Sequence, residues 1–248
     1  MNSVNEDEII KNDEIKKEKE ILHEDLEECP SKLDIKHTML LSLSFAIVLM
    51  AWGYFNLFVP KLLGELIPLN TPGRFTIIGL IVALDNLLAL LLLPYFGELS
   101  DKTESKFGRR LPFILVGTTL SAVFLAMMPW FRLLSALITL IFLFDISMAF
   151  FRSPALSLVP DYTKKENQSM ASGVQQFIAN LGALVGFIIP FAVAAIPNIN
   201  EELKENLGFL VCGAIMIAVG IIQFLKVKEI PTGENVFKIG NKKFSINL

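Results

Sequence analysis

The 248-residue sequence has few of the groups that build soluble active sites or disulfide scaffolds. Its only two cysteines, Cys29 and Cys212, lie far apart in the sequence. This spacing predicts no disulfide framework and no metal site. A nucleophile–base pair and a phosphate-binding loop are also lacking. We therefore expect no enzyme activity, no metal and no cofactor.

An excess of one charge sign is lacking as well. The formal net charge is −3, the first 37 residues are mostly polar, and acidic and basic residues alternate from Glu6 to Glu28. No basic surface is indicated, so we expect no nucleic-acid partner. A cleavable signal peptide is not expected either, because the first apolar run begins near Met39 behind a long charged segment. That run should remain in the membrane as an anchor.

Long apolar runs dominate the rest of the chain, and 53% of all residues are hydrophobic. The runs share a length close to the roughly 20 residues that cross a bilayer. They cover residues 39–59, 75–96, 112–130, 134–151, 170–196 and 207–225. None has the alternating polarity of barrel strands, so all are expected to be helices. The predicted fold is an all-α membrane protein with six transmembrane helices.

Lysines and arginines near the span ends predict the orientation. One side holds Lys32, Lys36, Lys102, Lys106, Arg109, Arg110, Lys164, Lys165, Lys226 and Lys228, and the other holds only Lys61, Arg74, Arg132 and Lys204. By the positive-inside rule, both termini are expected in the cytoplasm. The predicted parts are a charged cytoplasmic tail at 1–37, a transmembrane domain at 38–228 and a polar cytoplasmic tail at 229–248.

Three ionisable residues lie inside the apolar runs, where a charge is costly and usually functional. They are Asp85, Asp145 and Arg152. A buried carboxylate takes up a proton more readily than one in water, so both aspartates are candidate proton carriers, with structural pairing as the alternative. Asp145 and Arg152 are seven residues apart and can neutralise each other along one helix face. Alternatively, Arg152 reaches the lipid head groups.

Uncharged polar residues recur in the first, second and fifth runs. The candidates for a solute cavity are Tyr54, Asn56, Asn86, Gln176 and Asn180, with Trp52 close to the first two. Amides and aromatic faces suit a sugar, which offers hydroxyl groups and a ring face. The alternative is that the amides bridge neighbouring helices. Gly182 and Gly186 form a small-residue pair that predicts close helix packing.

A dense charged cluster, residues 97–112, separates the second and third runs and is expected to be a loop. Its Gly97, Asp101, Gly108, Arg109 and Arg110 resemble the motif that major facilitator superfamily transporters carry at this place. The long spacing between Asp101 and Gly108 is similar to that of sucrose transporters and the glycoside-pentoside-hexuronide:cation symporters. The stretch 152–161 resembles the end of the fourth span in the same group.

The resemblance implies a six-helix bundle equivalent to the N-terminal half of such a transporter. It implies alternating-access transport of a sucrose-like sugar or glycoside, coupled to protons. Sodium coupling is not expected, because Leu93 and Arg152 stand where melibiose-type members hold carboxylates. The charged loop would act as a cytoplasmic gate, held partly by a helix end of a second half.

The expected partners are the sugar, the lipid bilayer and a second half or second copy that completes the cavity. The expected location is the plasma membrane. The alternative function is that of a non-transporting membrane protein, either a truncated product or an interaction partner.

Overall fold

The structure is a computed structural model that describes residues 33–103, 105, 108–163 and 165–227, and the backbone of 236–239 and 242–245. The predicted N-terminal tail at 1–37 lies outside the described residues up to residue 32. The predicted C-terminal tail at 229–248 lies outside them except for two short strands.

Six long helices form the described transmembrane part, and each is long and apolar enough to cross a membrane. They are α2 (Ile35–Leu66), α3 (Arg74–Lys102), α4 (Leu111–Met127), α5 (Leu134–Asp161), α6 (Gln168–Ala194) and α7 (Glu201–Lys226). Two short 3₁₀ helices, η1 (Met128–Trp130) and η2 (Lys165–Asn167), follow α4 and precede α6. The prediction of a six-helix membrane fold is confirmed.

The two strands belong to a separate unit of the chain. They are β1 (Val236–Ile239) and β2 (Lys242–Ser245). The strands pair antiparallel, with Val236 opposite Ser245.

Local chemistry sets several helix ends. Asp34 caps α2 by accepting a hydrogen bond from the His37 backbone N–H at 3.1 Å. Beyond the C-terminal end of α2, Pro68 has no N–H to donate to the Gly64 carbonyl. The Arg74 guanidinium, at the start of α3, donates to that carbonyl instead. The connection between α2 and α3 is thereby tied to both helices.

The charged cluster after the second apolar run is helical at its beginning. The expectation of a loop from residue 97 was wrong there, because α3 continues to Lys102. Lys102 Nζ and Glu98 Oε1 lie 2.5 Å apart, one helical turn from each other. Such an i,i+4 pair stabilises a helix at its exposed end, and Lys102 also complements the helix dipole. The length of an apolar run therefore underestimates the length of a helix that continues into polar residues.

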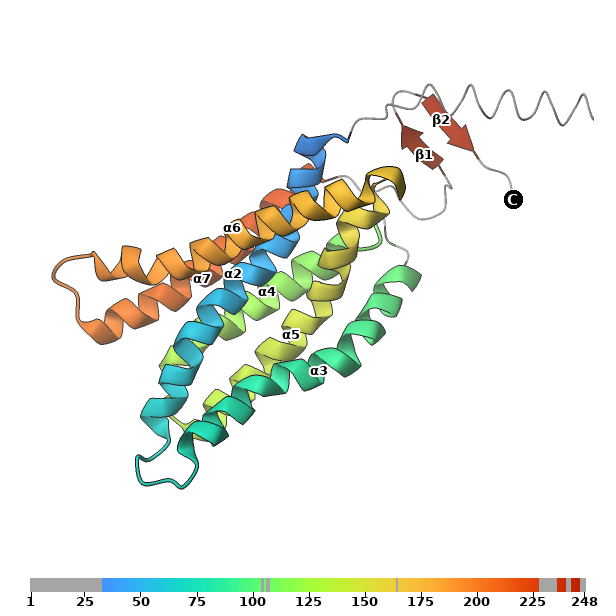
Figure 1. Ribbon diagram of the computed structural model, residues 1–248. Helices are drawn as coiled ribbons and strands as arrows, with labels where there is room; N and C mark the ends of the chain where they lie inside the picture. The colour runs from blue at the N-terminus through green and yellow to red at the C-terminus, as the bar shows by residue number, and fades with distance from the viewer. Residues whose placement is uncertain are drawn as a thin grey trace, which may run out of the picture. The chain divides into compact units, whose positions relative to one another are not determined.

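The helix α2 lies at the centre of the packing, and α6 crosses it closely (Figure 1). A Cβ atom added at Gly182 would overlap the backbone of Ala46, and one at Gly186 would overlap that of Met50. The absence of side chains at these two positions lets the backbones approach. The predicted close packing of this pair is confirmed, and its partner is α2.

The core is aromatic and lies between α2, α5 and α7. Its largest fully buried side chains include Tyr54, Phe55, Phe144, Phe151 and Phe209. The rings of Phe55 and Phe144 stack at 4.9 Å and join α2 to α5. Large side chains in contact across helices provide most of the packing energy.

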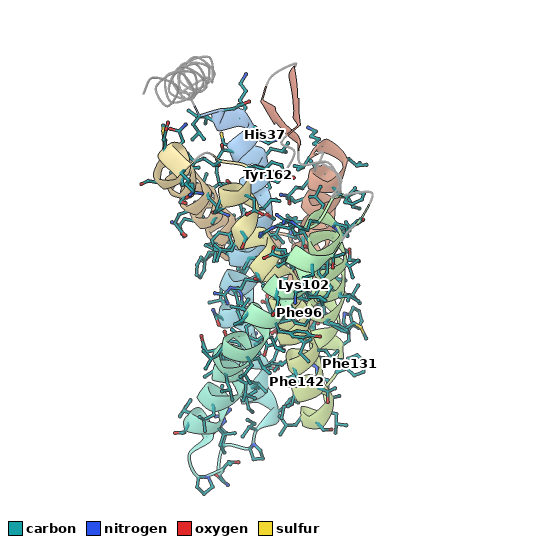
Figure 2. All side chains as sticks on the ribbon, turned by 90° about the vertical axis from the view of Figure 1, so that its right-hand side faces the viewer. His37, Phe96, Lys102, Phe131, Phe142 and Tyr162 are labelled. Carbon is teal, nitrogen blue, oxygen red and sulfur yellow. The ribbon has the colours of Figure 1, made fainter. Side chains whose placement is uncertain are left out.

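Aromatic contact also occurs at one end of the bundle. Figure 2 shows His37 beside Tyr162, with ring centroids 6.3 Å apart. These residues join the beginning of α2 to the end of α5. This end, which also holds Asp161, is called the Asp161 end, and the opposite one is called the Arg132 end.

The helix α3 is the least covered of the six. It packs mainly against α5, as Figure 1 shows, and only Ile78 and Ser100 are buried along its length. Large apolar side chains such as Leu80 and Leu90 are exposed. An apolar, uncovered helix surface is what a lipid environment accepts.

Candidate functional site

A cavity of about 570 Å³ lies between α2, α3 and α5 and has both apolar and polar lining residues. Its polar lining residues are Trp52, Asn56, Asp85, Asn86 and Arg152. Four of the sequence-predicted candidates therefore meet at one place, although they come from three helices.

The spacing of the lining residues explains how the helices form the cavity. On α2 they are Leu49, Trp52, Asn56 and Pro60, and on α3 they are Phe75, Ile78, Gly79, Val82, Ala83, Asp85 and Asn86. Steps of three and four residues place each set on one helix face. Gly79 and Ala83 carry little or no side chain, which keeps space open in front of α2.

Asn56 provides two acceptors on the α2 side of this cavity. Pro60 has no N–H, so the helix loses the usual donor to the Asn56 carbonyl four residues earlier. Both residues line the cavity. The backbone of Asn56 therefore adds an acceptor to the donor and acceptor of its own side-chain amide.

The carboxylate of Asp85 is held beside its neighbour. Asn86 Nδ2 donates to Asp85 Oδ1 at 2.7 Å. Arg152, across the cavity on α5, interacts electrostatically with Asp85. One negative and one positive group therefore face the same volume without a direct ion pair between them among the described residues.

Asp145 lies on α5 and is only 4% exposed. Neither of its carboxylate oxygens has a hydrogen-bond partner among the residues that the structure describes. The expected neutralisation of Asp145 by Arg152 is thus not formed, because Arg152 lines the cavity whereas Asp145 is buried outside its lining. Asp85 is the charged group that interacts with Asp145. The two carboxyl groups are therefore electrostatically linked.

Trp52 is held by neighbouring rings on the cavity wall. Its ring centroid lies 5.3 Å from that of Phe55 and 5.9 Å from that of Phe144. Its indole N–H has no partner among the described residues. Trp52 thus offers an aromatic surface to the cavity, while its indole N–H is buried. The spacing of four between Trp52 and Asn56 is the signal that separates this pair from Tyr54.

Three predicted cavity residues lie elsewhere. Tyr54 is fully buried, and its hydroxyl packs against Gly208 of α7. Gln176 and Asn180 are exposed on α6, where Gln176 Nε2 donates to Asn180 Oδ1 at 3.2 Å. Their shared face is confirmed. They do not line the cavity between α2, α3 and α5.

An amide on α6 that does bridge helices is the neighbouring Gln175, which sequence reasoning did not single out. Its Nε2 donates to the carbonyls of Ala155 at 3.3 Å and Leu156 at 3.2 Å. Pro160 removes the helical N–H that would otherwise reach the Leu156 carbonyl. A proline followed by an amide on the next helix is the sequence signal for this contact.

Residues of the motif between α3 and α4 form ion pairs with each other and with the end of α5. Arg110 Nη2 lies 2.9 Å from Asp101 Oδ1 and 2.6 Å from Asp161 Oδ2. Arg109 Nη2 reaches the same oxygen of Asp161 at 3.0 Å. Gly108 has a φ of 100°, which favours glycine. The arginines thus have partners within the chain, whereas the resemblance placed a partner in a second half.

Gly97, the first residue of this motif, lies on α3 where that helix meets α5. A Cβ atom there would lie 2.7 Å from Ser153 Oγ. The glycine therefore permits close contact between α3 and α5.

Asp161 was not singled out from the sequence. The available signal was its place at the end of the fourth span, on the same side as the arginines.

The described residues contain no group of three or more His, Cys, Asp or Glu side chains that could hold a metal ion. Cys212 is buried and unbridged, while Cys29 lies outside the described residues.

Comparison with known proteins gives one family. Residues 41–246 match the family model of the Major Facilitator Superfamily. This range includes most of α2 and the whole of the five following helices. No curated protein matches the chain.

Proposed function

We propose, from the premise that this chain belongs to the Major Facilitator Superfamily, that it takes part in proton-coupled transport of a sugar or glycoside. Membrane transport is the activity of that family, and the six apolar helices make the chain an integral multi-pass membrane protein. The observation that carries the proposal is the cavity between α2, α3 and α5, which combines an indole, two amides, a carboxylate and a guanidinium.

A neutral polyhydroxylated solute suits this set of groups. Its hydroxyls can donate to Asp85 and to the Asn56 carbonyl, and can accept from Arg152 and Asn86. The face of Trp52 suits the apolar face of a sugar ring. The volume of about 570 Å³ lies within the range of small-molecule sites. The sucrose-like spacing of the motif around Asp101 supports the same solute class.

Asp85 and Asp145 provide a route for the coupling proton. Asp85 faces the cavity, and Asp145 is buried behind it with no hydrogen-bond partner among the described residues. An uncompensated buried charge costs several kcal/mol. A proton taken up from the cavity through Asp85 therefore stabilises the closed site. Its release follows when water reaches the two carboxyl groups again.

We infer that a second half or a second copy of the chain covers polar surfaces that this helix bundle leaves open. Asn86 on α3 and the pair Gln176 and Asn180 on α6 are exposed within membrane-spanning helices. Polar groups in lipid are unfavourable unless another protein surface covers them. The completed transporter would lie in the plasma membrane, with both termini in the cytoplasm.

Uptake into liposomes tests the proposal directly. The full chain is reconstituted alone, and entry of labelled sucrose or maltose is followed with and without an inward proton gradient. The expected result is uptake that rises with the gradient. Asp85→Asn and Asp145→Asn should retain solute binding and lose the gradient dependence, whereas Glu98→Gln, at an exposed position outside the cavity, should behave as the wild type.

Two results would contradict the proposal at different points. If gradient-driven uptake persists in both aspartate variants, Asp85 and Asp145 do not carry the coupling proton. If neither uptake nor binding of the sugar is seen, a sugar is not the solute. Cross-linking of an Asn180→Cys variant separates the two ways of completing the cavity, because only a second copy yields a symmetric covalent dimer across α6.

A further inference from the structure

A second pocket, of about 710 Å³, lies near the Arg132 end between α2, α6 and α7. It shares no lining residue with the cavity described above. Tyr54 and Phe58 line it from α2, while Glu205 and Gly208 line it from α7. The pocket therefore uses the part of α2 that the transport proposal leaves without a role.

Charged side chains surround this second pocket, and the cations among them are already paired. Its charged lining residues are Lys61, Arg132, Lys204, Glu65, Glu201, Glu202 and Glu205. Four carboxylates against three cations leave a formal charge of −1. The surplus favours a positively charged ligand.

The ion pairs place each cation on a carboxylate. Arg132 binds Glu65 at 3.0 Å and Glu202 at 2.8 Å. The hydrogen bond to Glu202 raises the pKa of Arg132, so this guanidinium stays charged. Lys61 Nζ binds Glu205 Oε2 at 3.0 Å. An anion would have to displace these carboxylates, whereas a cation would not.

Two acceptors of the pocket are buried and unused. The Glu205 side chain is 10% exposed, and its Oε1 has no hydrogen-bond partner among the described residues. Tyr54 is 0% exposed, and its hydroxyl likewise has none. That hydroxyl packs over Gly208, where an added Cβ would overlap it. Buried polar atoms without partners are unfavourable, and a bound donor would satisfy them.

The remaining wall suits the hydrocarbon part of a ligand. Tyr54 and Phe58 stack with ring centroids 4.7 Å apart. Apolar side chains from the end of α6 complete the wall, namely Pro190, Phe191, Val193 and Ala194. Aromatic rings beside a carboxylate attract ammonium groups through their electron-rich faces.

We propose that this pocket binds a primary ammonium group, with Glu205 Oε1 and the Tyr54 hydroxyl oxygen as its acceptors. The ligand is a lipid with an ethanolamine head group or a free alkylamine, which share this chemistry. An ammonium group has three donors and no acceptor, so it matches the Glu205 carboxylate oxygen, which only accepts, and the Tyr54 hydroxyl oxygen, which accepts as well as donates. A metal ion fits less well, because the Lys61 ammonium occupies the other oxygen of Glu205.

Binding to the purified full chain in detergent tests the proposal. The probes are ethanolamine, dihexanoyl phosphatidylethanolamine and the uncharged N-acetylethanolamine, measured by microscale thermophoresis. Binding of ethanolamine and of the lipid identifies a free-amine site, and binding of the lipid alone identifies a head-group site. Binding of neither, or equal binding of N-acetylethanolamine, overturns the proposal.

Variants assign the binding to the pocket. Glu205→Gln should lower the affinity for the probe by about tenfold, which is the usual effect of losing a charged hydrogen bond. Tyr54→Phe should weaken it less. Lys61→Gln should tighten binding, because it frees the second oxygen of Glu205, and a damaged fold would not produce this opposite sign. Glu98→Gln is the charge-matched control, and unchanged affinity in Glu205→Gln would overturn the assignment.

Discussion

Arg110 and Asp161 form a short ion pair, with Nη2 and Oδ2 2.6 Å apart. The guanidinium is almost fully buried, and it also holds Asp101 of α3. The pair therefore joins the connection between α3 and α4 to the last residue of α5. While this ion pair is intact, the start of α4 and the end of α5 must move together.

Replacing Asp161 by asparagine should loosen this end. The change removes a charge that both Arg109 and Arg110 contact. Leaving a buried guanidinium with fewer partners should lower the free energy of unfolding by about 1–3 kcal/mol. Thermal unfolding of the purified protein in detergent measures this. Glu98→Gln, which breaks an exposed pair on α3, should leave stability nearly unchanged; equal losses in the two variants would contradict the assigned role of Asp161.

A single methyl group at Gly182 should disrupt the crossing of α2 and α6. Gly182→Ala places a Cβ against the Ala46 backbone, which cannot move as a flexible side chain can. We expect a loss of about 1–3 kcal/mol. The matched control is Gly173→Ala on the same helix, where an added Cβ meets nothing within 4 Å. The control should be neutral or stabilising, because alanine favours helix more than glycine does. Similar melting temperatures of the two variants would rule out the close crossing.

Gln175 and Gln176 are adjacent, but replacing each by leucine should affect the stability of the protein differently. Gln175→Leu removes the donor to the Leu156 carbonyl and should destabilise the protein by about 1–2 kcal/mol. Gln176→Leu, on the exposed face, should leave stability nearly unchanged. Adding Pro160→Ala to Gln175→Leu restores a helical N–H for the same carbonyl. The double variant should recover part of the loss in chemical unfolding, and no recovery would show that the carbonyl is not the cause.

Trp52 should report solute binding by its fluorescence. The chain has two tryptophans, and Trp130 is exposed and lies outside the cavity. A Trp130→Phe variant leaves Trp52 as the single emitter. If a sugar stacks on the indole, its emission should change in a saturable manner with sucrose or maltose. A response that survives in Trp52→Phe would place the bound solute elsewhere.

Some features were readable without the structure because they depend on local periodicity. Glycines four residues apart, Gly182 and Gly186, predicted close packing on any partner helix. The common face of Gln176 and Asn180 followed in the same way. The membrane itself simplifies such reasoning, since backbone groups in lipid must bond within a helix or barrel.

Other features depended on contacts between distant segments. The sequence separation of Asp145 and Arg152 allowed an ion pair, but the packing along α5 places Arg152 in the cavity lining and buries Asp145 two turns away, outside that lining. Tyr54 and Asn56 are two residues apart on α2, about 200° around a helix. Only the neighbours of α2 decide that Asn56 lines the cavity, whereas Tyr54 lines the second pocket with α7.

The six helices, their passage through a membrane and the motif around Asp101 were predictable from the sequence, because hydropathy and turn chemistry act over short stretches of chain. Which polar side chains meet depends instead on how the helices pack. Side chains on different helices are brought together by helix rotation and crossing, which follow from packing against neighbours. Arg110 and Asp161 are therefore partners for a reason that no single stretch of the sequence contains.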